Sequence, residues 1–96
     1  MSLYFVQHQH TAETCPAKDA TMGANLLSHL SPLNARKFGI DIQGEAVLDG
    51  KHTLVLIVEA DKPEQIDIFM EPFKQAGTVV VIPASTCETV VERAGC

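Results

Sequence analysis

Residues 40–60, IDIQGEAVLDGKHTLVLIVEA, decide the fold. Residues 40–48 alternate apolar and polar side chains over most of their length, and residues 52–60 are rich in Val, Leu and Ile. Both patterns are typical of β-strands. The Asp49-Gly50 pair between them is the strongest two-residue indication of a hairpin turn. The stretch therefore predicts two antiparallel strands joined by a tight turn.

A strand and one or more helices flank this hairpin on each side. Before it, the pattern predicts a strand over residues 3–8, a helix capped by Asp19 that runs through residues 22–30, and a short helix over residues 31–38 closed by Gly39. After it, the pattern predicts a helix over residues 63–76 that Pro72 kinks or ends, a strand over residues 78–83, and a short helix over residues 85–94.

The resulting order, β-α-β-β-α-β with a further C-terminal helix, is the ferredoxin-like plan of the α+β class. We expect a four-stranded antiparallel sheet of order 4-1-3-2 with both main helices on one face. A chain of 96 residues has no room for two separate cores, so residues 1–96 are expected to form a single domain.

The two faces of this sheet differ in their expected surroundings. Alternation places Leu3 and Phe5 with Leu54, Leu56 and Val58 under the helices. The opposite face then carries a second set, expected to line a crevice: Tyr4, Val6, Gln43, Glu45, Val55, Ile57 and Glu59. Because a monomer seldom exposes an apolar sheet face, we expect a homodimer that packs sheet against sheet.

Composition limits the partners. The chain is 46% hydrophobic, with seven basic residues against twelve acidic ones and a net charge of −5. The absence of a basic cluster argues against nucleic acid, and no apolar run reaches membrane-spanning length. No secretory signal is recognisable, and three cysteines without a CxxC motif are typical of thiols in a reducing compartment. The expected location is therefore the cytoplasm.

The whole chain resembles the dimeric α/β-barrel superfamily, in which two ferredoxin-like subunits face each other across their sheets. The resemblance is carried by the pattern of Val58–Asp61, Phe69–Phe73, Val79–Pro83 and Cys87–Val91. Within this superfamily, the chain is similar to small bacterial domains of unknown or loosely known function, to nickel-binding members, and to cofactor-free monooxygenases and isomerases. The resemblance implies the fold and a homodimer, and it carries over no catalytic residue.

His8 and His10 are two residues apart at the end of the first strand. In a strand both imidazoles project from one face, about 7 Å apart by Cα, so they can converge on one ion. Cys15 follows after a short connection and can fold back over the same strand end. The three side chains suit Zn, Ni or Cu. Two polar residues ending a strand are the plainer interpretation.

Other functions remain open. Cys15 can instead be a reactive thiol near a helix N-terminus. A histidine can serve as general base of a cofactor-independent monooxygenase or isomerase that holds a small apolar substrate in the sheet-face crevice. The chain can also be an interaction module alone. We interpret His52 as a solvated residue of the hairpin, and Cys87 and Cys96 as turn and terminal thiols remote from the two histidines.

Overall fold

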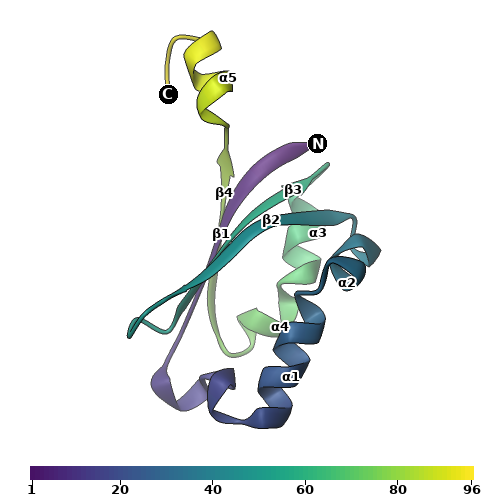
Figure 1. The fold of residues 1–96 in the computed structure, drawn as a ribbon, viewed down its shortest axis with the longest axis vertical. Helices are drawn as coiled ribbons and strands as arrows, with labels where there is room; N and C mark the ends of the chain where they lie inside the picture. Colours follow the sequence, from purple (N-terminus) through teal and green to yellow (C-terminus); the bar gives the residue numbers. More distant parts are fainter.

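The computed structural model describes residues 1–96, which form a four-stranded sheet with helices (Figure 1). The elements in chain order are β1 (Ser2–His10), η1 (Ala12–Thr14), η2 (Pro16–Lys18), α1 (Ala20–His29), α2 (Pro32–Lys37), β2 (Ile40–Leu48), β3 (Thr53–Ala60), α3 (Pro63–Phe69), α4 (Glu71–Lys74), β4 (Gly77–Ala84) and α5 (Cys87–Glu92). The elements η1 and η2 are single turns of 3₁₀ helix. No helix is long and apolar enough to cross a membrane.

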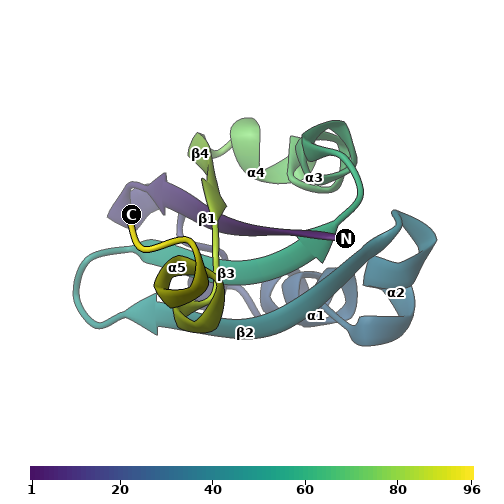
Figure 2. The same ribbon diagram turned by 90° about the horizontal axis from the view of Figure 1, so that it is seen from above.

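The sheet has the order β2-β3-β1-β4, and every neighbouring pair is antiparallel. This is the predicted order read from the other edge, so the predicted α+β class and sheet topology are confirmed. Helices α1 to α4 lie on one side of the sheet, and α5 projects beyond the far end of β4 (Figures 1 and 2). The opposite side of the sheet is not covered by a helix (Figure 1).

Local chemistry begins and ends the helices as the sequence predicts. The Asp19 carboxylate accepts hydrogen bonds from the backbone of Thr21 and Met22 at 2.8 and 3.2 Å, which caps α1. The Ser31 hydroxyl accepts one from Asn34 at the start of α2. Pro72 breaks the predicted third helix into α3 and α4, because a proline inside a helix removes a backbone donor and clashes with the preceding turn.

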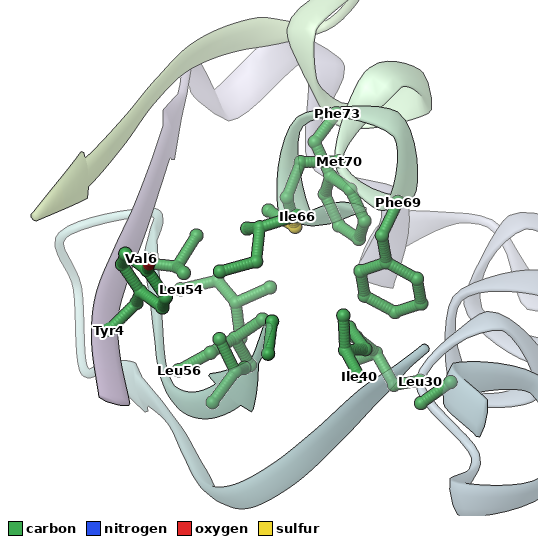
Figure 3. Close-up of a cluster of buried hydrophobic side chains, with 13 residues drawn as sticks. Tyr4, Val6, Leu30, Ile40, Leu54, Leu56, Ile66, Phe69, Met70 and Phe73 are labelled. Atoms are coloured by element: carbon green, nitrogen blue, oxygen red, sulfur yellow. The ribbon is translucent and has the colours of Figure 1, made fainter. Parts of the chain in front are cut away.

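The hydrophobic core lies between the sheet and α3–α4, with contributions from the end of α1 and from α2 (Figure 3). Ile66, Phe69 and Met70 supply its helical side, and all three are almost completely buried. Truncation of a buried Phe costs about 3–5 kcal/mol. By contrast, α1 has no fully buried residue within its bounds, so it is held to the body more loosely than α3.

The predicted faces of β1 are wrong. β1 pairs with β3 so that Val6 lies opposite Leu56 and His8 opposite Leu54, which puts these residues on the face that the helices cover. Val6 is 0% exposed and Tyr4 is also buried. Tyr4 and Val6 are therefore core residues and do not line a crevice on the other face. Residues 3–6 are apolar on both sides, so alternation within β1 does not fix the face, and the pairing register does.

A β-bulge in β2 overturns a second face assignment. The pairing with β3 shifts by one residue between Ile42 and Gly44, and Glu45 then lies opposite Leu56. A one-residue shift moves every later side chain to the other face of the sheet. Glu45 therefore projects from the same face as the core, although it remains exposed on the edge strand. Gln43 stays on the opposite face, where its amide donates to Asp41 and Glu59.

The side of the sheet away from the core, called the open face below, has an apolar centre. The residues of this apolar centre come from β3, β1 and β4. They are Phe5, Val55, Ile57, Val80 and Ile82. Ile57, Val80 and Ile82 are exposed, and Phe5 and Val55 are half-buried. The expected apolar patch exists, with Phe5 in the place predicted for Val6.

Gly77, the first residue of β4, offers a test of the packing that positions β1. A Cβ at Gly77 would collide with the carbonyl of Gln9 and come within 3.0 Å of His8 Nε2. We expect Gly77→Ala to lower the free energy of unfolding by about 1–3 kcal/mol, because backbone must move to admit the methyl group. Chemical denaturation measures this loss.

Gly44→Ala is the matched control, because a Cβ there meets nothing within 4 Å. It is expected to change the free energy of unfolding by no more than about 0.5 kcal/mol. Equal losses in the two variants would contradict the packing described for Gly77.

Candidate metal centre

Three metal-ligating side chains gather at one end of the sheet. The ligand atoms of His10, Cys15 and His52 all lie within 4.8 Å of one another, and all three residues are half-buried. His10 is the last residue of β1, Cys15 separates η1 from η2, and His52 immediately precedes β3. The group thus draws on three segments of the chain.

The pairing of β1 with β3 brings the two histidines together. The ladder ends with Gln9 opposite Thr53, and the His10 backbone N–H donates to the His52 carbonyl at 3.1 Å. Their ring centroids are 5.4 Å apart. His52 has φ +48°, a left-handed conformation that is uncommon for a residue with a side chain. The hairpin connection therefore occupies residues 49–52, and its last residue carries a candidate ligand.

Cys15 reaches the group because the chain after β1 turns back. Pro16 starts η2 directly after it, and the backbone of Cys15 is extended. The Thr14 hydroxyl donates to the carbonyl of Ala76 at 3.2 Å, which ties this segment to the residue before β4. The prediction that Cys15 folds back over the end of β1 is confirmed.

His10 has the most unusual environment of the three. Both its ring nitrogens are enclosed by protein and have no hydrogen-bond partner. An enclosed polar atom without a partner costs about 1–3 kcal/mol, and such atoms are rare in folded proteins. Burial, and after it the neighbouring His52, lower the pKa of His10 below its usual 6.5. His10 is therefore held as a neutral imidazole, the form that binds metal ions.

His8 lies directly behind His10. Their rings stack with centroids 5.1 Å apart, and the edge of Phe73 contacts His8 at 5.1 Å between centroids. His8 is 3% exposed, and its Nε2 has no hydrogen-bond partner. Burial and then His10 lower its pKa, against a smaller opposing effect of the Phe73 backbone. His8 is a buried neighbour of the group and not one of its three members.

The dimensions of the group suit a transition-metal ion. A point equidistant from three atoms 4.8 Å apart lies about 2.8 Å from each, whereas zinc–nitrogen and zinc–sulfur bonds are about 2.0–2.3 Å long. Side-chain movements of about 0.5–0.8 Å therefore suffice for coordination. Two imidazoles and a thiolate are ligands that Zn, Ni and Cu accept. The group can hold a metal ion.

The other residues predicted for a site lie elsewhere. Glu59 lies near the opposite end of the sheet, opposite Leu3, and accepts a hydrogen bond from Gln43. Glu45 is exposed on the edge strand. Cys87 and Cys96, which were predicted to be remote from the two histidines, are exposed and belong to the projecting C-terminal segment (Figure 1). None of these residues joins the group.

His52 is the member of the group that the sequence pattern predicted to be a solvated hairpin residue. Its place beside His10 follows from the predicted strand order. Because β1 and β3 are adjacent and antiparallel, the end of one lies beside the start of the other. His10 and His52 occupy these two positions.

Comparisons with known proteins give no relative on which to rest a role. No family model matches the chain, and no curated protein matches its sequence. The function must therefore be argued from the site itself.

The lowered pKa values of His8 and His10 predict how stability depends on pH. In the unfolded chain these two residues take up protons near pH 6.5, and in the folded chain they do so only at lower pH. We therefore expect the free energy of unfolding of the metal-free protein to fall as the pH is lowered from about 7.5 to about 5.5. Urea denaturation across this range measures the effect.

The double variant His8→Leu/His10→Leu distinguishes the contribution of these two histidines to the pH dependence from that of all other titrating groups. Its free energy of unfolding is expected to depend less on pH over the same range, because two proton-binding groups are gone. A steeper or unchanged dependence in this variant would contradict the assigned environments.

Proposed function

We propose that this protein binds a transition-metal ion through His10, Cys15 and His52. The observation that carries the proposal is the enclosure of His10: both ring nitrogens lack a partner, beside a thiol and a second imidazole. An ion bound there would replace the missing hydrogen bond of one nitrogen. No other described feature of the chain offers His10 a partner.

The ligand set also favours a role in handling or sensing the ion. Structural zinc sites use four protein ligands, whereas this group offers three and leaves one position for water or another ligand. An open position lets an ion enter and leave, or pass to a second molecule. We propose Zn, Ni or Cu as the ion, since a thiolate and two imidazoles suit all three.

Metal content of the untagged protein, purified without chelator, tests the proposal. We expect about one ion per chain in the unaltered protein. Removal of one ligand, in Cys15→Ala or His52→Asn, is expected to weaken the metal affinity by at least about tenfold. Asn is chosen at position 52 because it tolerates the positive φ of His52. With Co²⁺ as the probe, Cys15→Ala is also expected to lose the sulfur-to-metal charge-transfer absorption.

Cys87→Ala is the matched control for Cys15→Ala, because Cys87 is an exposed thiol at the far end of the molecule. Its metal content and absorption are expected to equal those of the unaltered protein. Protein that arrives without metal and takes up none of the three ions would refute the proposed function.

We further propose that the protein is a homodimer joined through the open face. Two features support a second copy as the occupant of this face. Ile57, Val80 and Ile82 are apolar and exposed there. Helix α5 projects past the end of the sheet, as Figure 1 shows, and Val91 in it is 76% exposed. A second copy would cover both surfaces.

The variant Ile57→Lys tests the dimer, because a lysine at the centre of the open face opposes burial of that face. We expect a dimer for the unaltered protein and a monomer for Ile57→Lys at micromolar concentration, measured by size exclusion with light scattering. Thr78→Lys, near the end of the same face, is the control. A monomeric unaltered protein would refute this interface without bearing on metal binding.

A further inference from the structure

A cavity of about 330 Å³ lies between the end of β1, helix α1 and helix α4. It opens on the helical side of the sheet, away from the open face. Its floor includes Phe73 and His8, and its α1 wall includes Met22, Leu26 and His29. This volume falls in the range of sites that hold small molecules, about 300–1,000 Å³.

The polar atoms of the cavity wall are mostly occupied already. His29 donates from Nε2 to the Phe69 carbonyl at 2.8 Å, and its Nδ1 lies 3.3 Å from the side-chain amide of Asn34. The Thr14 hydroxyl donates to Ala76. His8 Nε2 is the exception because it has no hydrogen-bond partner, but protein encloses it and it is not exposed to the cavity. These residues therefore present ring faces and methyl groups to a ligand, and they offer few free hydrogen bonds.

The absence of charged residues in the wall further limits the chemical class of ligand that the cavity can hold. The residues that line the cavity include no Lys, Arg, Asp or Glu. A charged ligand would lose its hydration here without gaining an opposite charge, which is costly. Aromatic rings prefer stacked or edge-on contact with other rings, and Phe73, His8 and His29 supply three.

We propose that this cavity binds a small, uncharged, aromatic molecule that lies against Phe73 and the rings of His8 and His29. A polar substituent on such a molecule would be directed toward Asn25, an exposed residue of the wall. The site is separate from the metal group, although His8 lies between the two and contacts His10. Binding does not depend on the presence of a metal ion.

Two fluorescent probes that differ by one charged group test the proposal on the full chain. N-phenyl-1-naphthylamine is uncharged and aromatic, and 8-anilinonaphthalene-1-sulfonate is the same ring system with a sulfonate. We expect the uncharged probe to bind saturably, one per chain, and the sulfonate to bind at least about tenfold more weakly. Equal affinity for the two probes, or no saturation, would overturn the proposal.

A matched pair of variants in α1 locates the bound probe. Met22 lines the cavity and is 48% exposed, whereas Leu27 is 69% exposed and does not line it. Met22→Trp fills part of the cavity and is expected to weaken the uncharged probe about tenfold, and Leu27→Trp is expected to leave it unchanged. Thermal unfolding of both variants confirms that each remains folded.

The open face is the competing location for an apolar probe. Ile57→Lys alters that face without touching the cavity. Retained binding in this variant supports the cavity, and loss of binding would place the probe on the open face and overturn the proposal. In the unaltered protein, the ring resonances of His8 and His29 should move on probe addition, with little movement of His52.

Discussion

The pairing of β1 with β3 is the contact on which the rest of the structure depends. These two strands occupy the centre of the sheet, and one register places Tyr4, Val6 and His8 against α3 and α4. A slip of one residue would send all three to the open face and turn Leu3, Phe5 and Gln7 toward the helices instead. The same register ends with His10 beside His52, so the core and the candidate metal group are fixed together.

The crowding of imidazoles at the end of this ladder has an electrostatic consequence. His10 lies against His8 on one side and His52 on the other, with ring centroids 5.1 and 5.4 Å apart. Protonation of any one ring disfavours protonation of the next. At the proposed site a metal cation would instead bind neutral His10 and His52 together with Cys15. The lowered pKa values of His8 and His10 favour neutral rings, the form that a metal ion at the proposed site would need.

The sequence predicts the elements of this fold better than it predicts their faces. Asp19, Ser31 and Pro72 act within a few residues of themselves, so their effects are visible in the chain. The face of β1 and the bulge at Gly44 depend on pairing between distant strands, which local alternation does not record.

The candidate site could be predicted only in part, because one of its members reaches the group through pairing between distant strands. Cys15 follows β1 closely enough for its return to be expected, whereas His52 is more than forty residues from His10 in sequence and meets it only through the ladder. His8 was expected beside His10 in the ligand set. Its place in the core came from packing with Phe73, which the spacing of the two histidines does not reveal.

The loose attachment of the segment that carries Cys15 affects how long an ion would stay. Neither η1 nor η2 has a buried residue, and α1 has none either. Segments with few buried contacts open far more often than the whole domain unfolds. Detachment of this segment would remove the thiolate and leave two imidazoles on the intact sheet. The residence time of a bound ion would then be set by local opening, and exchange with another carrier would proceed without loss of the fold.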